Sequence, residues 1–168
     1  MRRDTKSSKT WRSYHVVTRG ADGTLESGET PFLDELGSGD GDPTETAINK
    51  MRLLQAHGMP EATWCIKNSK GKALVDRADD KEPAIWILKC WPGCWRLYFY
   101  VHRVSDDDNR IVYLHAKCKK KQQRDSADSI YARRLYNGIG PGGSGHAPLA
   151  LQGSAPLSIR SISAGPGQ

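Results

Sequence analysis

A cluster of basic side chains follows a strand-like segment in the second half of the chain. The stretch "IVYLHAKCKKKQQRD", residues 111–125, alternates apolar and polar side chains and then places four lysines within five positions, 117–121. Lysine and arginine bind phosphate groups, and tyrosines interleaved with them can stack on splayed-out bases. These residue types indicate contact with a nucleic acid, and single-stranded RNA fits them best.

The region around this cluster is also basic. Residues 64–124 contain fourteen Lys or Arg against seven Asp or Glu, and the whole chain has a formal net charge of +6. Charge of this sign favours an acidic partner but does not bear on the fold. Two ordinary alternatives stay open: the lysine run can be a solvated loop, and His115 can be a structural histidine that only satisfies hydrogen bonds.

Length and composition limit the class of protein. A chain of 168 residues is long enough for one domain with a sizeable core. No apolar run is long enough to span a membrane, and the basic start is followed by no apolar signal segment. We therefore expect a soluble, cytoplasmic protein with no membrane partner and no cofactor.

Four cysteines bear on redox state and on metal binding. Because the chain lacks a secretory signal, Cys65, Cys90, Cys94 and Cys118 are expected to be reduced. Cys90 and Cys94 are spaced C-x3-C, whereas zinc ribbons commonly use C-x2-C, so no metal site is predicted. A zinc-stabilised module remains the structural alternative, since Cys94 and Cys118 would be neighbours if their strands pair.

The chain divides into one domain with loose ends. Residues 1–9 and the Gly-, Ser- and Pro-rich stretch 137–168 show no periodicity, so we expect a flexible basic N-terminus and a disordered tail. The domain then covers residues 10–136. Apolar spacing, helix caps and turn residues predict strands over 11–18, 63–67, 84–90, 94–102 and 110–118, and helices over 30–37, 42–58 and 125–138.

The strands at 94–102 and 110–118 are predicted to form an antiparallel hairpin. Their alternation gives one apolar face, which would pack on the helices, and one face with basic, histidine and tyrosine side chains, which would be exposed. Directly opposed residues share a face, and the loop length decides which residues oppose. The predicted pairs are Arg96 with Lys117, Tyr98 with His115, and Tyr100 with Tyr113.

The order of these elements and several short sequences resemble a known superfamily of toxins. The strand "WRSYHVVTRG", the helix "TPFLDEL", the strand "GCWRLYFY" and the strand that runs into "KKKQ" are similar to the RelE/ParE superfamily, in particular to its HigB-like, phage-derived branch. The resemblance covers about residues 11–136. It implies an α+β fold in which a RelE-like antiparallel sheet packs on two N-terminal helices, with a C-terminal helix and a concave open face.

The resemblance also implies a function. Members of the RelE and HigB type are toxins of type II toxin-antitoxin systems that cut messenger RNA, generally in the ribosomal A site, and an antitoxin holds them silent. We therefore expect a metal-independent endoribonuclease whose partners are a cognate antitoxin, messenger RNA and the ribosome. ParE-like members share the fold but inhibit DNA gyrase, so a gyrase inhibitor or a phage nucleic-acid-binding protein is the alternative.

A mechanism follows as a hypothesis. RNA can be cut by attack of its own 2′-hydroxyl on the adjacent phosphate, which needs orientation, charge stabilisation and proton transfer. Arg96 would clamp the phosphate. Lys119 or Lys120, crowded among like charges, would remove or donate a proton. His115 or Tyr98 could share that duty.

The candidate site residues combine this chemistry with the resemblance. The strand basic residues of the family match Lys89 and Arg96, and its basic residues after the last strand match Lys119 and Lys120. The candidate catalytic residues are Arg96, Lys119, Lys120, His115 and Lys89. The candidate RNA-binding residues are Lys67, Lys70, Lys72, Tyr98, Tyr100, Tyr113, Lys117, Lys121 and Arg124.

Overall fold

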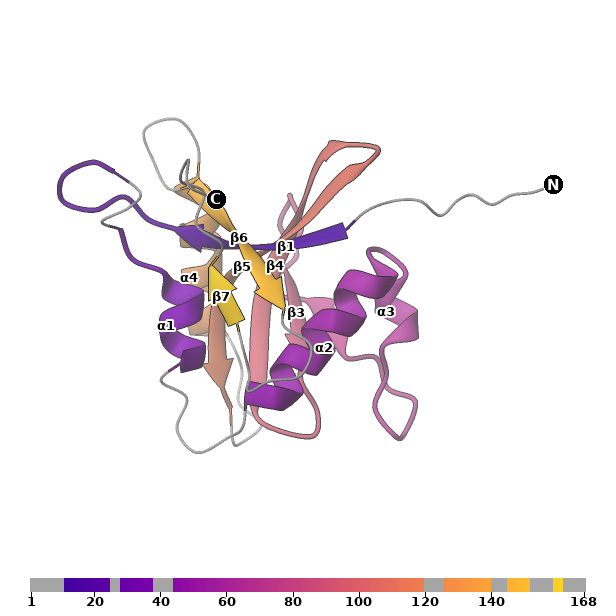
Figure 1. Cartoon of the computed structure of the whole chain (residues 1–168). Helices are drawn as coiled ribbons and strands as arrows, with labels where there is room; N and C mark the ends of the chain where they lie inside the picture. The colour runs from indigo at the N-terminus through magenta and orange to yellow at the C-terminus, as the bar shows by residue number, and fades with distance from the viewer. Residues whose placement is uncertain are drawn as a thin grey trace.

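The computed structural model describes residues 11–24, 28–37, 44–119, 126–139, 145–151 and 159–161, in which one strand is followed by three helices, four strands, a fourth helix and two strands (Figure 1). The helices are α1 (Pro31–Gly37), α2 (Thr44–His57), α3 (Ala62–Cys65) and α4 (Ser126–Asn137). The strands are β1 (Trp11–Val17), β2 (Val75–Arg77), β3 (Trp86–Lys89), β4 (Trp95–Ser105), β5 (Asp108–Cys118), β6 (Gly145–Leu151) and β7 (Ile159–Ser161).

These strands form one mixed sheet. Their order across the sheet is β2-β3-β4-β5-β1-β6-β7. All neighbours pair antiparallel except β1 and β5, which run parallel. Short connections join β3 to β4 and β4 to β5 and allow antiparallel pairing, whereas β1 reaches β5 only through the helices and the intervening strands. The α+β fold class is confirmed, and the expectation of a purely antiparallel sheet is wrong.

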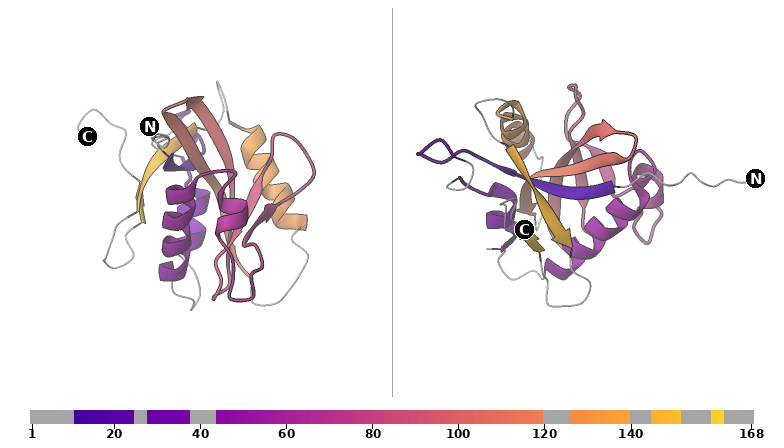
Figure 2. Two further views of the ribbon diagram at one scale, coloured as in Figure 1. Left: turned by 90° about the vertical axis from the view of Figure 1, so that its right-hand side faces the viewer. Right: turned by 45° about the horizontal axis from the view of Figure 1, so that its top comes forward.

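Helices lie on both faces of the sheet. Helices α1 and α2 cover one face and α4 covers the other, as the left view of Figure 2 shows. Each face therefore has its own apolar core. The core under α1 and α2 includes Phe32, Met51, Leu54, Leu97 and Phe99. The core under α4 includes Ile87, Tyr98, Tyr100, Val112 and Leu114 from the sheet and Ala132 from the helix.

Helix α4 covers the face that the alternation pattern had left open. Tyr98 is 0% exposed and Tyr100 is 5% exposed. The ring of Tyr136, near the end of α4, meets the ring of Tyr100 edge-on with 4.8 Å between their centroids. A strand face on which tyrosines alternate with charged residues is typically exposed. The large tyrosine ring, however, also offers an apolar surface against which a helix can pack. The expectation of an open face with exposed tyrosines is wrong for the described residues.

A β-bulge changes the register of the hairpin partway along. Arg96 opposes Lys117 and Tyr98 opposes His115, so these two predicted pairs are confirmed. Phe99 then opposes Tyr113, two residues before His115 on β5, and Tyr100 opposes Val112 instead of Tyr113. A bulge adds one residue to one strand and reverses which side chains face each side beyond it. Tyr113 therefore lies in the core under α1, where its ring stacks on Phe32 at 4.8 Å.

The segment predicted as a strand at 63–67 is instead the short helix α3. The Cys65 N–H donates to the Glu61 carbonyl at 3.0 Å, and the Ile66 N–H donates to the Ala62 carbonyl at 3.2 Å. Ala62 and Ile66 are both buried against the core under α1 and α2. Packing of these two side chains outweighs the strand preference of the β-branched and aromatic residues between them.

Part of the expected tail belongs to the sheet. Strand β6 pairs antiparallel with β1, and Leu149 of β6 is 6% exposed. The disordered-tail prediction for 137–168 is therefore wrong for Gly145–Leu151. Composition predicted a loose segment because Gly, Ser and Pro dominate it. Pairing with a neighbour far away in the chain satisfies the backbone of this strand, and composition does not report such pairing.

We expect Gly58→Ala to destabilise the fold more than Gly71→Ala. Both glycines have left-handed backbones, with φ of 73° and 80°. A Cβ at Gly58 would overlap the indole ring of Trp11, whereas a Cβ at Gly71 would meet open space. The left-handed conformation costs about 1 to 2 kcal/mol at either position, and the overlap adds roughly 1 to 3 kcal/mol at Gly58. Urea denaturation measures both losses, and equal losses would contradict the packing of Trp11 on Gly58.

Candidate phosphate-binding site

Three basic residues lie side by side across β3, β4 and β5. Lys89 opposes Arg96, and Arg96 in turn opposes Lys117. Opposed residues share a face, and alternation along β4 puts Arg96 on the same face as Tyr98. These three residues, named the basic row from here on, therefore lie on the α4 side of the sheet, next to the pair Tyr98 and His115.

The basic row is accessible, unlike the tyrosines behind it. The side chain of Lys89 is 38% exposed, Lys117 is exposed and Arg96 is half-buried. Lys89 forms an ion pair with Asp76 of β2, with 2.7 Å between Nζ and Oδ2. Such a row suits the phosphate groups of a nucleic acid, which bind Lys and Arg through charge-assisted hydrogen bonds.

Beside the basic row, His115 and Lys119 meet at a carboxylate of α4. The Lys119 Nζ lies 2.7 Å from Oδ2 of Asp128, and the His115 Nε2 lies 3.2 Å from Oδ1 of the same carboxylate. Asp128 is in the first turn of α4, where the helix dipole also stabilises a negative charge. Only 11% of the Lys119 side chain and 9% of the His115 side chain are exposed. Both groups are thus largely covered by the helix.

Burial and charge together decide the protonation of these groups. Burial lowers the pKa of His115, and the hydrogen bond to Asp128 opposes this shift without overcoming it. Burial would raise the pKa of Asp128, but hydrogen bonds from Lys119 and His115 outweigh it and hold that pKa below its usual value. At neutral pH, Asp128 is therefore a carboxylate and His115 a neutral imidazole. A neutral imidazole bonded to a carboxylate carries its proton on Nε2, which leaves Nδ1 as an acceptor.

Two aromatic rings hold the imidazole of His115 in place. The Tyr98 ring stacks on it with 5.4 Å between centroids, and the Tyr131 ring of α4 meets it edge-on at 4.7 Å. Contacts on two sides, together with the bond to Asp128, restrict the rotation of the imidazole. His115 therefore has the surroundings of a structural histidine as well as a position next to the basic row.

The structure brings some predicted site residues together and separates others. The basic row unites Lys89, Arg96 and Lys117, and His115 and Lys119 lie beside it. Three further lysines lie instead on the exposed loop between α3 and β2, outside the basic row. They are Lys67, Lys70 and Lys72.

The remaining predicted residues do not contribute to an exposed surface in the described part of the chain. Tyr98, Tyr100 and Tyr113 are at most 5% exposed, so their expected stacking on RNA bases has no accessible ring to act through. Burial under α4 accounts for the first two, and the bulge accounts for the third. Three predicted residues, Lys120, Lys121 and Arg124, lie outside the described residues.

Sequence reasoning missed Asp128. The sequence around it indicates only the start of a helix, where an acidic side chain is common. One further signal is that Asp128 follows the lysine cluster by only a few residues. If the helix packs back against the preceding strand, this short separation allows its carboxylate to reach the lysines. That return depends on the direction of α4, and no local pattern reports this direction.

The cysteines differ from expectation. Cys94 and Cys118 form a disulfide across the ends of β4 and β5, with 4.7 Å between their Cα atoms, so the expectation of reduced thiols is wrong for this pair. Their predicted proximity in the hairpin is confirmed. The Lys119 N–H also donates to the Cys94 carbonyl at 2.7 Å, so the disulfide and this bond together hold the chain beside the basic row. Cys65 and Cys90 are free thiols.

The described residues contain neither a metal-binding cluster nor a membrane-spanning helix. Among them, no three His, Cys, Asp or Glu side chains gather closely enough to hold a metal ion. Over the same ranges, every helix is too short or too polar to cross a membrane.

Comparison with protein-family models, with curated proteins and with solved structures finds no match to this chain.

We expect Asp128→Asn to lower the pKa of His115 further, because the carboxylate raises that pKa against the effect of burial. NMR titration of the His115 ring signals measures this pKa. The matched variant Asp76→Asn removes a carboxylate that is paired with Lys89 instead, so the His115 titration should stay as in the wild type. An unchanged or raised His115 pKa in Asp128→Asn would contradict the contact between the two side chains.

Proposed function

We propose that this protein is an endoribonuclease toxin of the RelE type, from a type II toxin-antitoxin system, and that the basic row holds the scissile phosphate of messenger RNA. The observation that carries the proposal is the alignment of Lys89, Arg96 and Lys117 across three strands. The order of elements agrees in part with the resemblance, since β1, α1 and α2 precede an antiparallel meander that leads to α4, whereas α3, β6 and β7 have no counterpart in the expected order.

The groups around the basic row suit cleavage by the 2′-hydroxyl of the RNA. Arg96 and Lys117 would neutralise the phosphate and the charge that develops on it. The 2′-oxygen would bond to phosphorus as the bond from phosphorus to the 5′-oxygen breaks, leaving a 2′,3′-cyclic phosphate and a 5′-hydroxyl. In this proposal the neutral His115 accepts the proton of the 2′-hydroxyl, and the Lys119 ammonium supplies a proton to the leaving oxygen.

Asp128 would hold both groups in place before RNA binds, and its departure would free them for the two proton transfers. Its carboxylate holds Lys119 and His115 at 2.7 and 3.2 Å and stabilises the ammonium form of Lys119. Because α4 leaves only about a tenth of each side chain exposed, proton transfer would require the start of this helix to move away from β5. Catalysis in this proposal therefore depends on RNA or the ribosome displacing the first turn of α4.

The same burial favours a second candidate function. If α4 stays in place, the basic row still binds phosphate groups but His115 and Lys119 cannot reach them. The protein would then be a non-catalytic binder, either a gyrase inhibitor of the ParE type or a phage nucleic-acid-binding protein. Affinity would in that case fall gradually with each cation removed and with added salt, since each phosphate contact releases counterions.

The partners follow from the proposed function. Messenger RNA in the ribosomal A site would be the substrate, and ribosomal RNA would contact the surrounding basic surface. A cognate antitoxin in the cytoplasm would block the protein by covering the basic row. An acidic segment of the antitoxin would suit this surface, because opposite charges steer association and fix the orientation of the partners.

We expect discrete cuts in messenger RNA in a reconstituted translation reaction, and we expect Arg96→Ala to slow them by roughly 10² to 10³-fold through loss of charge stabilisation. Primer extension maps and quantifies the cuts, with and without ribosomes. Lys50→Ala is the matched control, because it removes a cation from α2, on the other face of the sheet, and should leave the rate unchanged. A folded wild-type protein that makes no cuts in either reaction but binds RNA would support the non-catalytic binder instead.

A further inference from the structure

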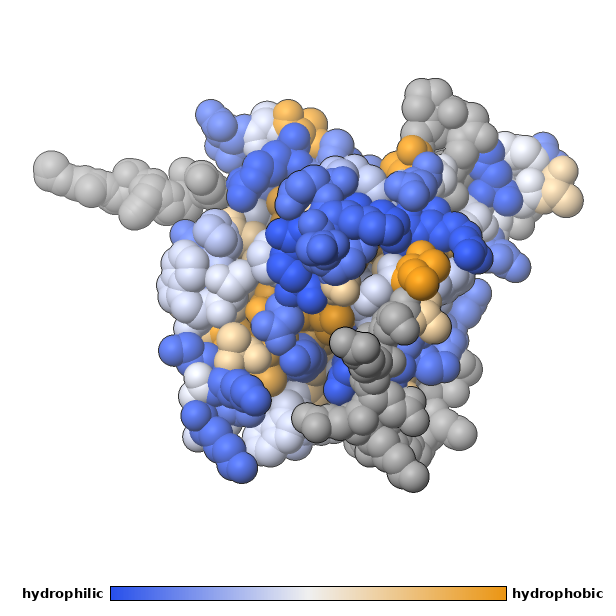
Figure 3. All heavy atoms as spheres, turned by 180° about the vertical axis from the view of Figure 1, so that it is seen from behind, coloured by the Kyte–Doolittle hydropathy of each residue, from blue (hydrophilic) through white to orange (hydrophobic). Residues whose placement is uncertain are grey.

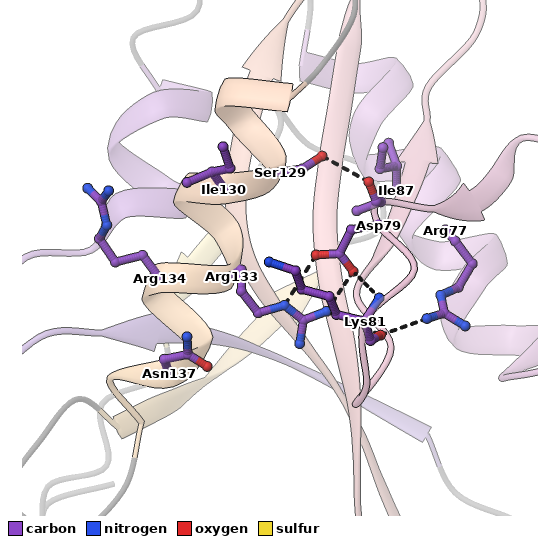
Figure 4. A pocket seen from close by; sticks show the side chains of 10 residues that line it. Arg77, Asp79, Lys81, Ile87, Ser129, Ile130, Arg133, Arg134 and Asn137 are labelled. Carbon is purple, nitrogen blue, oxygen red and sulfur yellow. Dashed lines mark hydrogen bonds and ion pairs between the residues drawn. The ribbon is translucent and has the colours of Figure 1, made fainter.

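A second feature of the α4 side is an open pocket between this helix and residues 77–87. Its volume is about 760 Å³, which is within the range of small-molecule and nucleotide sites. Figure 4 shows the side chains that line it. The helix contributes Ser129, Ile130, Arg133, Arg134 and Asn137, and the opposite wall contributes Arg77, Ala78, Asp79, Lys81 and Ile87.

The base of this pocket, named the α4 pocket from here on, is a satisfied polar network. Arg133 is 8% exposed, and its Nη2 and Nε lie 2.7 and 3.2 Å from the two carboxylate oxygens of Asp79. Its Nη1 also donates to the Pro83 carbonyl at 2.7 Å, and the Ser129 hydroxyl donates to the Ala78 carbonyl at 3.1 Å. These bonds join α4 to the chain after β2. The pocket is therefore preformed and does not depend on a ligand to hold its walls together.

The rim of the α4 pocket offers both apolar and charged groups. Ile130 is 58% exposed although it is a large apolar side chain, and Ile87 lies deeper as part of the core. In Figure 3 this side of the molecule is mostly hydrophilic, with a few apolar side chains at the surface. In Figure 4, Arg134 points away from the pocket, whereas Arg77 on the opposite side points toward Lys81, to whose carbonyl it donates a hydrogen bond at 2.7 Å. A ligand with a flat apolar ring and flanking negative charge matches this arrangement, and a nucleotide has both.

The α4 pocket adjoins the basic row along β3. Ile87 of the pocket and Lys89 of the row are two residues apart on one strand, so they share a face and their Cα atoms lie about 7 Å apart. Arg77 of the pocket is also next in sequence to Asp76, the partner of Lys89. A phosphate on the basic row and a base in the α4 pocket can therefore belong to one nucleic-acid strand.

We propose that the α4 pocket receives a base of single-stranded RNA next to the phosphate held by the basic row. This inference rests on the proposed function, because it requires the basic row to bind the RNA phosphate. Ile130 would contact the face of the base, and Lys81 and Arg134 would contact the neighbouring phosphates. The basic row would then position the strand, while the pocket would decide which bases are preferred.

The test compares RNA with bases and RNA without them. Fluorescence anisotropy at low salt measures the affinity of the full chain for a labelled single-stranded RNA hexamer and for an all-abasic ribose-phosphate hexamer of the same length. We expect the bases to strengthen binding by roughly 5 to 30-fold, because a base packed on Ile130 removes apolar surface of both groups from water. Ile130→Ser should remove most of this advantage and leave the affinity for the abasic strand unchanged.

Two controls separate the pocket from the basic row. Leu53→Ser changes another large apolar residue on a helix, 42% exposed on α2, which lies on the other face of the sheet, and should bind both strands like the wild type. Arg96→Ala should weaken binding of both strands by the same factor. This variant tests the phosphate contact alone, because the abasic strand retains every phosphate.

Two results would overturn the inference in distinguishable ways. If both strands bind and Arg96→Ala weakens them, but Ile130→Ser matches Leu53→Ser, the α4 pocket does not bind a base and the proposed function stands. If neither strand binds the wild type, or Arg96→Ala has no effect on either, the basic row does not hold RNA, and the proposed function fails together with the inference.

Discussion

The docking of α4 on the sheet determines which groups of this protein can meet another molecule. Two carboxylate contacts hold the helix: Asp128 binds Lys119 and His115 of the β5 end, and Asp79 binds Arg133. All of these side chains are less than one-fifth exposed. Removal of one partner from a buried ion pair typically costs about 3 to 5 kcal/mol, because the other charge is left uncompensated. The helix is therefore anchored at two points by interactions that tolerate little change.

This anchoring divides the α4 face into a closed part and an open part. Tyr98 and Tyr100 are enclosed and supply packing area, whereas Lys89, Arg96 and Lys117 remain at the margin of the helix. A nucleic acid that approaches this face would meet cations and the partly exposed ring of Tyr131, but not the rings of Tyr98 and Tyr100. Phosphate contacts generally position a strand, and base contacts select its sequence. Any base selectivity would then come from groups beside α4, not from the strands beneath it.

The hairpin of β4 and β5 places the basic row relative to the helix. Its end is held by the Cys94–Cys118 disulfide and by the bond from the Lys119 N–H to the Cys94 carbonyl. The bulge lies between the disulfide end of the hairpin and its turn. Tyr98 remains opposite His115, but beyond the bulge the side chain of Tyr113 lies in the core under α1 and α2. One added residue on β5 thus allows a single strand to supply a buried aromatic group to each face of the sheet.

Local patterns in the sequence determined the element types and the near end of the hairpin. Caps, apolar spacing and alternation predicted α1, α2, α4 and most strands. The loop length predicted that Arg96 pairs with Lys117 and Tyr98 with His115. Both predictions succeeded because these features depend on residues close together in the chain. Only the tertiary structure decided that α4 covers the tyrosines, that Asp128 returns to Lys119, that β6 joins β1 and that β1 runs parallel to β5. These contacts join residues far apart in sequence, or depend on the direction in which a helix leaves its connecting segment. Periodicity reports how each element is buried, but it does not identify the element that buries it.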